Sequence, residues 1–352
     1  MSAAVLTMTD AGLYCPAGDF HIDPWRPVER AVVTHAHADH LRWGSKRYLV
    51  SRAGEAVTRV RLGPDAAIQT VEYGLSLAMN RATVSLHPAG HVLGSAQIRV
   101  EVQGEVWVVS GDYKTRGEDP TCLPFEPVRC HGFVTESTFG LPIYQWASSS
   151  AIFAGINDWW RANAAVGKAS VIYAYSLGKA QRVLAGLDPA IGPILTHGAV
   201  ERLTAAYRES GVALPETRYA GVAETKGKPK AQYAGNMIVA PPSAEGSPWV
   251  RKFAPYSSAV ASGWMAIRGT RRRRAVDRGF VLSDHADWGG LQWAIRETGA
   301  ERVWVTHGYT AVLVRSLRER GLDAQVLVTK FEGEAGSDAP PTAEEIIQAV
   351  SR

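Results

Sequence analysis

The 352-residue chain has few features that would mark an exported or membrane-embedded protein. Its three cysteines, Cys15, Cys122 and Cys130, form no C-x-x-C pair and no even-numbered framework, which is typical of a reducing cytosol. The N-terminus lacks a basic stretch followed by an apolar run, so no secretory signal is expected. No window approaches about 18 uninterrupted apolar residues, so no membrane span is expected. We therefore expect a cytoplasmic protein.

Charge of either sign is also modest. Charged residues make up 20% of the chain and hydrophobic residues 46%, as in ordinary globular proteins. The net charge of +4 permits a polyanionic partner without identifying one. The length allows one large domain or two modest ones.

The pattern of apolar runs changes twice along the chain. The first part alternates short apolar runs with turns, which predicts strands at 30–34, 82–86, 97–102, 106–110 and 132–135. The middle part alternates strands and helices, which indicates a parallel α/β unit, with helices at 151–164, 178–187 and 200–210 and strands at 170–175 and 193–196. The first pattern then returns, with strands at 279–283, 302–306 and 324–329. We infer one domain formed by 1–145 and 271–352, interrupted by an inserted domain at 146–270.

Side chains of the metal-binding type follow these apolar runs. They are His35, His37, Asp39, His40, His91, Asp112, Glu136, His285 and His307. Each lies at or just beyond the C-terminal end of its run, where the loops at one sheet edge can converge and carry function on a rigid frame. Four of them fall within six residues, which favours a metal site over solvated histidines. The isolated His21, His87, His131 and His197 favour ordinary surface or core positions.

The spacing of the run at 35–40 suggests two metals. In an extended segment His35 and His37 point the same way and can bind one ion, while Asp39 and His40 in the following turn can bind a second. Imidazole suits zinc, iron or manganese, and carboxylates suit harder ions. A carboxylate such as Asp112 can bridge two ions about 3.5–4 Å apart, which is the arrangement of a metal-dependent hydrolase.

These residues resemble the metallo-β-lactamase superfamily. The run at 35–40 is similar to its main motif, with His91, Asp112 and His307 in the order of its later ligands. Asp23, before the first strand, resembles its structural acidic motif. The resemblance implies an αββα sandwich and two divalent metal ions, Zn²⁺ and/or Mn²⁺. It implies His35, His37 and His91 on one metal, Asp39, His40 and His307 on the other, and Asp112 between them. Asp23 would hold the histidine loop by hydrogen bonds rather than bind metal.

Three further segments resemble the extra motifs of the β-CASP nucleases. These segments are 135–138, 283–287 and 305–308, and the inserted segments 175–181 and 262–265 resemble parts of the α/β cassette of that group. The resemblance implies that His285 protonates the leaving oxygen and that Glu136 orients His285, with Asp112 also catalytic. Read from the residues alone, Glu136 could instead be a strand-end cap and His285 a helix-entry residue.

The inserted domain is expected to hold a nucleic-acid backbone. Ser176, Gly178 and Lys179 lie where a strand gives way to a helix, and a helix N-terminus with a lysine is suited to phosphate. The alternative is that Ser176 is only a helix N-cap.

Within the group, the compact length and the segments 22–25, 34–37 and 282–288 look most similar to the bacterial ligase-associated DNA exonucleases. This implies a DNA exonuclease of DNA repair that works alongside a DNA ligase. The alternative is an RNA-processing nuclease, exo- or endoribonuclease, of the same fold, because His at the position of His307 is linked with RNA substrates in this group. The long insert argues against a small-molecule hydrolase. The full ligand set argues against a binding protein with a degenerate site.

Overall fold

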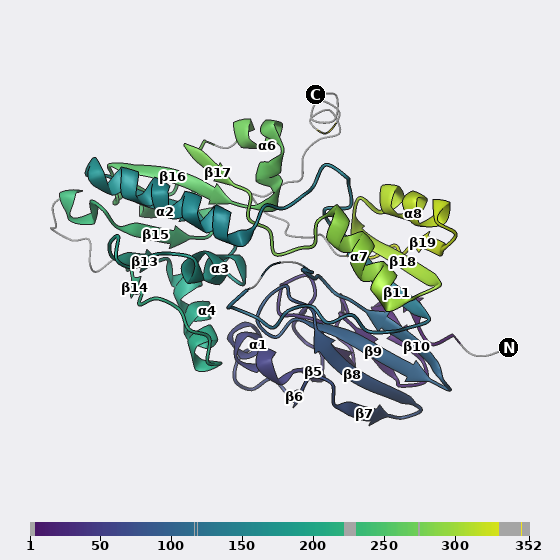
Figure 1. Ribbon diagram of the computed structural model, residues 1–352. Helices are drawn as coiled ribbons and strands as arrows, with labels where there is room; N and C mark the ends of the chain where they lie inside the picture. The colour runs from purple at the N-terminus through teal and green to yellow at the C-terminus, as the bar shows by residue number, and fades with distance from the viewer. Residues whose placement is uncertain are drawn as a thin grey trace. The chain divides into compact units, whose positions relative to one another are not determined.

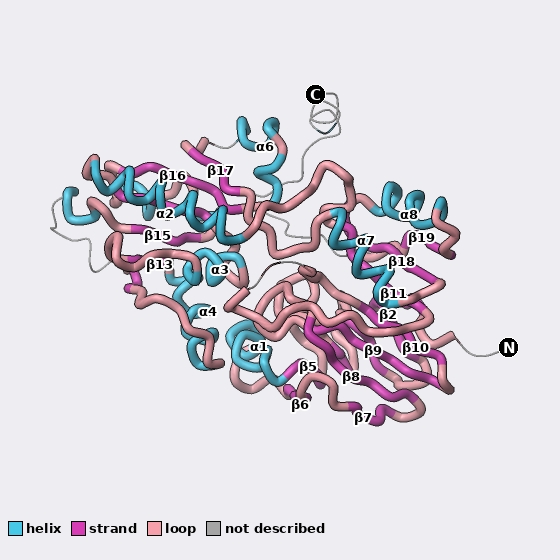
Figure 2. Tube along the Cα trace, viewed as in Figure 1, coloured by secondary structure: helices cyan, strands magenta, loops and turns pink. Residues whose placement is uncertain are grey.

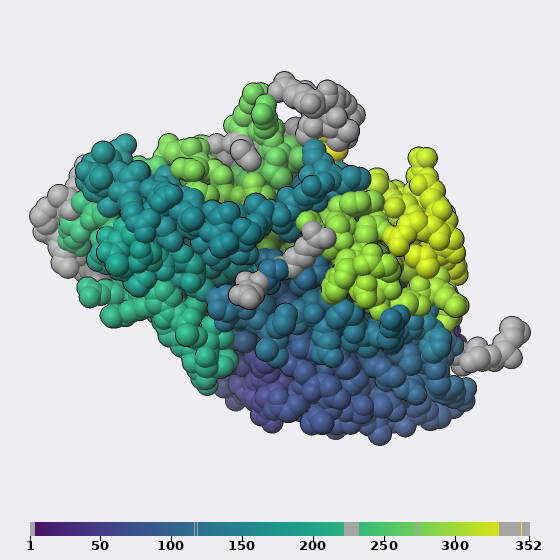
Figure 3. Space-filling model, in the orientation of Figure 1, coloured from purple at the N-terminus to yellow at the C-terminus, as the bar shows by residue number. Residues whose placement is uncertain are grey.

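The computed structural model describes residues 4–115, 117, 119–221, 230–273, 275–330 and 346. These residues fold as mixed α/β and divide into two compact units (Figure 1). The described residues of 1–145 and 285–330 form the first unit, and those of 146–284 lie in the second. Figure 3 shows the atoms of the molecule as spheres in the same orientation, coloured along the chain. None of the described helices is long and apolar enough to cross a membrane.

The first unit contains two sheets. One has six strands, in the order β1 (Thr7–Thr9), β2 (Gly12–Cys15), β3 (Phe20–Ile22), β4 (Arg30–Val32), β5 (Arg47–Ser51) and β6 (Ile68–Val71). The other has seven, in the order β19 (Asp323–Val326), β18 (Arg302–Gly308), β11 (Gly132–Ser137), β10 (Glu105–Val109), β9 (Ala96–Val102), β8 (Ala82–Pro88) and β7 (Ser76–Met79). Helices of this unit are α1 (Glu55–Leu62), α7 (Trp288–Thr298) and α8 (Thr310–Glu319).

Both faces of the seven-stranded sheet are buried. Trp107 packs in a core that also includes Phe20 and Val32 of the six-stranded sheet. The next residue along β10, Val108, packs in a different core with residues of α7 and α8, such as Leu291 and Leu317. Successive strand residues point to opposite faces, so a strand buried on both faces reads as an unbroken apolar run. This explains why β10 and β11 were recognisable from the sequence.

The direction of the strands brings several of their ends to one edge. Strands β8 and β10 both run antiparallel to β9, which lies between them (Figure 2). Strands β10, β11 and β18 are parallel neighbours. Therefore β8, β10, β11 and β18 run in the same direction, and the residues that follow them lie along the same edge of the sheet.

The second unit is built on a parallel sheet. Its order is β14 (Arg218–Tyr219), β13 (Ile194–Thr196), β15 (Met237–Ala240), β12 (Ala169–Tyr173), β16 (Tyr256–Ala261) and β17 (Arg278–Phe280). Its helices are α2 (Ser149–Ala165), α3 (Lys179–Ala185), α4 (Gly198–Glu209), α5 (Pro248–Arg251) and α6 (Arg268–Arg273). Helices and strands pack on one core, in which Trp160 of α2 and Val183 of α3 meet Ile172 and Val239.

Two sequence expectations differ from the structure at the end of this sheet. The strand expected at 279–283 is β17, which ends at Phe280, so residues 281–283 lie outside the sheet. Strand β17 pairs in parallel with β16 after α6, as a β-α-β crossover. Residues 278–280 therefore belong to the sheet of the second unit, although the sequence predicts that the returning domain begins at residue 271.

Candidate metal centre

The loop that carries the histidine run is folded around one buried carboxylate. Asp23 is 2% exposed and follows β3 directly. Its two oxygens accept hydrogen bonds from the Thr34 backbone N–H at 2.7 Å and from the Thr34 hydroxyl at 2.5 Å. Its Oδ2 atom also lies 2.7 Å from His40 Nδ1. Asp23 thus fixes the start of the loop and orients the His40 ring, the role expected of an outer-shell group.

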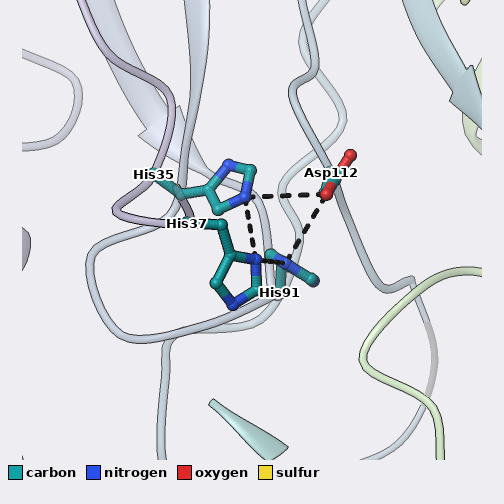
Figure 4. Close-up of side chains that lie close together, drawn as sticks. All are labelled: His35, His37, His91 and Asp112. Atoms are coloured by element: carbon teal, nitrogen blue, oxygen red, sulfur yellow. Dashed lines mark hydrogen bonds and ion pairs between the residues drawn. The ribbon is translucent and has the colours of Figure 1, made fainter. Parts of the chain in front are cut away.

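Three imidazole nitrogens converge on one point beside Asp112 (Figure 4). His37 Nδ1 lies 3.1 Å from His35 Nε2 and 3.1 Å from His91 Nε2. Two ligands of a tetrahedral ion, each 2.0–2.1 Å from it, would be about 3.3–3.4 Å apart. The spacing of these nitrogens is therefore close to that of a metal coordination shell.

Asp112 connects this group to a second one. Its Oδ2 atom lies 3.6 Å from His35 Nε2 and 3.7 Å from His40 Nε2. His40, Asp112 and His307 form the second group of converging ligand atoms. The other carboxylate oxygen of Asp112, Oδ1, is buried with no hydrogen-bond partner among the described residues. A buried acceptor left unsatisfied is costly, and a cation would satisfy it.

Asp39 lies at the border of the second group. Its Oδ2 atom is 3.8 Å from His40 Nε2, and its side chain is partly buried. Asp39 is not among the ligand atoms that mutually converge in that group. Within residues 35–40, His35 and His37 therefore belong to the first group and His40 to the second, with Asp39 at the edge of the second.

The carboxylates create a field that favours positive charge at His40. Burial alone would lower the pKa of His40, but Asp39, Asp112 and Asp23 overcome it and raise the pKa to about 10. Burial is the main cause that lowers the pKa of His35 well below its usual value and that of His307 to about 4, and the neighbouring His40 lowers both further. His35 and His307 therefore stay neutral, the form in which imidazole binds a metal. Burial, reinforced by Glu136, raises the pKa of Asp112 to about 7.

Glu136 and His285 form a buried pair next to these groups. His285 Nδ1 lies 2.9 Å from each carboxylate oxygen of Glu136. The Tyr113 backbone N–H donates to Glu136 Oε1 at 2.8 Å, which fixes the carboxylate. Burial would raise the pKa of Glu136, but His285 outweighs burial and lowers it, so Glu136 is ionised. The His285 ring lies 4.6 Å from the ring of His91, centroid to centroid.

An irregularity in strand pairing brings Glu136 and His307 into the centre. Strand β11 pairs with β18 through Thr135 and Val305, and then through Ser137 and Gly308, so one extra residue lies in β18. Such bulges re-aim side chains next to functional sites. His307 has a φ of +64°, which is uncommon for a residue with a side chain. No pattern in the amino-acid sequence indicates this bulge.

Two glycines beside the ligands are required by close contacts. Gly111, before Asp112, has a φ of +56°, and a Cβ there would lie 2.6 Å from Thr34 Cβ. Gly90, before His91, has a φ of +74°, and a Cβ there would lie 2.4 Å from the Lys114 carbonyl oxygen. Any larger residue at either position would displace the adjacent ligand loop.

The residues expected to bind phosphate lie in the second unit, around the start of α3. Gly178, rather than Ser176, is the N-cap, and its backbone N–H already donates to Gln181 Oε1 at 2.8 Å. Lys179 is 2% exposed, and its ammonium nitrogen lies 3.7 Å from Asp284 Oδ2. This burial counts against Lys179 as a phosphate ligand, although the role remains a prediction.

Arg182 of α3 was missed in the sequence analysis. Its Nη1 atom donates to Asp284 Oδ1 at 2.8 Å and to the Ser283 carbonyl at 2.9 Å. Arg182 and Asp284 are both almost completely buried. Helix α3 thus holds the segment that leads directly into His285.

Comparisons with known proteins found no matching family model. A "Probable DNA ligase" from Opitutus terrae is 30% identical over 336 residues, which cover 94% of this chain and 32% of that protein. An "Endoribonuclease ysh1" from Aspergillus fumigatus is 34% identical over 77 residues, which cover 21% of this chain and 9% of that protein. The chain therefore spans about a third of the first relative and a much smaller part of the second.

A solved structure of a protein of unknown function from Enterococcus faecalis V583 is similar in fold. Its TM-score is 0.56 at 11% sequence identity, and the match covers 86% of this chain and 80% of that one. This similarity concerns the fold alone.

Proposed function

We propose that the protein is a two-metal nuclease that hydrolyses phosphodiester bonds of DNA, as an exonuclease in DNA repair. The observation that carries the proposal is the position of Asp112, whose Oδ2 atom lies 3.6–3.8 Å from ring nitrogens of both histidine groups. One carboxylate oxygen between two such groups is the arrangement that two neighbouring cations require.

Each metal would have its own ligands. His35, His37 and His91 would hold one ion, and His40 and His307, with Asp39 at the edge, would hold the other. Divalent cations in these positions, Zn²⁺ and/or Mn²⁺, would supply Lewis acidity towards water and the phosphoryl oxygens. Asp112 would bridge the two ions.

The pair formed by Glu136 and His285 would manage the proton of the leaving group. With Nδ1 held by Glu136, the His285 ring keeps a fixed orientation and presents Nε2 for proton transfer. Buried, ionised Glu136 also stabilises the protonated form of His285. His285 would thus donate the proton, and Glu136 would orient the His285 ring.

DNA is preferred over RNA because of the extent of the similarities. The relative named as a probable DNA ligase matches 94% of this chain, whereas the relative named as an endoribonuclease matches 21%. The second candidate is an RNA-processing nuclease of the same fold, which the endoribonuclease similarity and His307 favour.

A functional association with a DNA ligase is part of the proposal. The relative from Opitutus terrae is about three times as long as the matched region, so most of that protein lies outside the similarity. We propose that the matched region of this relative is a nuclease. The ligase activity that its name states would then belong to the rest of that protein.

The fold that agrees best with these features is a metallo-β-lactamase sandwich with an inserted β-CASP domain. Two sheets share one core in the first unit. In the sequence, the residues that form the parallel sheet of the second unit are inserted between the two segments that form the first unit. The second unit would hold the nucleic-acid strand, with Ser176, Gly178 and Lys179 as the phosphate-binding candidates.

The test is cleavage of end-labelled single- and double-stranded DNA and RNA across a series of Mn²⁺, Zn²⁺ and Mg²⁺. We expect metal-dependent release of mononucleotides from DNA, abolished by a chelator and by His37→Ala. Equal or faster cleavage of RNA would favour the second candidate. Failure to cleave either polymer with any of the metals would refute the proposed function.

A further inference from the structure

One large aromatic side chain beside the metal centre is turned outward. Trp43 is 77% exposed, and it is the one tryptophan in the described part of the chain that is mainly exposed. An exposed indole offers a large, rigid, flat surface on which a nucleic-acid base can stack. Trp43 takes no part in the metal groups described above.

The loop around Trp43 is held firmly in place. The hydroxyl of Tyr48 donates to the Arg42 carbonyl at 2.9 Å and accepts a hydrogen bond from the Ser45 backbone N–H at 2.8 Å. The Ser45 hydroxyl in turn accepts from the Val28 backbone N–H at 3.2 Å. These bonds fix the chain on both sides of Trp43. The outward position of the indole is therefore built into the loop.

The position of Trp43 relates it to the metal centre. It lies three residues after His40, so the two Cα atoms are at most about 11 Å apart. The segment 41–47 also carries Arg42, Lys46 and Arg47 and contains no acidic residue, and Lys46 forms an ion pair with Glu29 of a neighbouring segment at 2.8 Å. An exposed indole flanked by cations, close to a candidate phosphodiesterase site, has the features of a surface for single-stranded nucleic acid.

We propose that Trp43 stacks on an unpaired base of the strand whose backbone occupies the metal centre. This inference rests on the proposed function and adds to it a preference for single-stranded or frayed ends, because a base within a duplex cannot stack on the indole. Arg42 and Arg47 would attract the adjoining phosphates. The contact is independent of sequence, since every base offers a flat face.

The experiment measures the binding of a fluorescein-labelled oligothymidylate by anisotropy, in a His285→Ala background that blocks cleavage. We compare Trp43→Ala and Trp43→Phe with the control Leu75→Ala, which alters another exposed apolar side chain of the same unit (58% exposed). A matched strand made of abasic nucleotides serves as the second probe. Trp43→Ala should weaken binding of oligothymidylate roughly 5- to 150-fold, which is the range for loss of one stacked base.

The remaining arms distinguish stacking from other roles. Trp43→Phe should recover much of the affinity, Leu75→Ala should match the parent, and the abasic strand should bind equally to the parent and Trp43→Ala. Unchanged affinity in Trp43→Ala would overturn the inference and leave the proposed function intact, provided that the wild type cleaves DNA or RNA. If Trp43→Ala weakened binding of the oligothymidylate and of the abasic strand equally, or changed the sedimentation mass of the protein, the stacking inference would be overturned. Trp43 would then have a structural or protein-docking role. A wild-type protein that cleaves no nucleic acid would refute the proposed function itself.

Discussion

The pair formed by Glu136 and His285 makes a quantitative prediction. His285→Ala removes the proposed proton donor, and Glu136→Gln keeps the volume but places an amide nitrogen where an oxygen faced His285 Nδ1 at 2.9 Å. The variant keeps one acceptor oxygen near Nδ1 but loses the negative charge of the buried carboxylate. General acid catalysis contributes about 10²- to 10⁴-fold to rate, so each single change should lower kcat by a factor in that range.

Because the two residues act as one unit, their effects should not add. We expect the double variant to lose no more activity than the more damaged single variant. All three variants should keep the metal content of the wild type, since neither residue belongs to the two histidine groups. Glu101→Gln, which alters a more exposed carboxylate paired with Arg99, should change kcat less than twofold.

The assay is single-turnover cleavage of an end-labelled strand, with metal content measured by mass spectrometry on the same samples. Multiplicative losses in the double variant would refute the idea that Glu136 works through His285. Loss of metal from His285→Ala would instead assign His285 to a metal, as a member of the third converging group with Asp112 and Glu136.

Three further predictions concern a hydrogen bond to a candidate metal ligand, a buried ion pair and a buried cysteine. Asp23→Asn removes the acceptor of the His40 ring and should lower metal affinity about 10- to 100-fold, measured by competition with a chromophoric chelator; unchanged affinity would contradict its orienting role. Asp284→Asn breaks a buried ion pair and should lower the free energy of unfolding by about 3–5 kcal/mol in urea, while Asp158→Asn, in an exposed pair of the same unit, should cost at most about 1 kcal/mol; equal costs would contradict the account. Burial raises the pKa of Cys130 to about 12, so a thiol reagent at pH 8 should label partly exposed Cys122 first and Cys130 only on unfolding; early labelling of Cys130 would show that this core opens readily.

The sequence was informative where a strand is buried on both faces or where ligands are adjacent in the chain. Strands β10 and β11 appear as apolar runs because Trp107 and Val108 face different cores. The histidine run could be interpreted because its residues lie within one short loop. The convergence of His91 and Asp112 with that loop follows from the common direction of β8 and β10, which the apolar runs alone do not specify.

Other features depend on contacts between distant parts of the chain. The bulge that turns Glu136 and His307 into the centre requires the pairing of β11 with β18, more than 160 residues apart. The burial of Lys179 depends on Asp284, which is also distant in the sequence. A lysine at a helix start is equally consistent with phosphate binding and with a buried ion pair until the packing around it is known. Strands of two to four residues, such as β14 and β17, are too short to show the alternation of apolar and polar residues that marks a strand in the sequence.

The most direct test of the central claim is the metal stoichiometry of the purified chain. Metal-free protein titrated with Mn²⁺ or Zn²⁺ in a calorimeter should bind two ions per chain. His91→Ala should selectively weaken one site and His307→Ala the other, while Asp112→Asn should weaken both. A single site in the wild type, or two sites of unchanged affinity in Asp112→Asn, would contradict a two-metal centre bridged by Asp112.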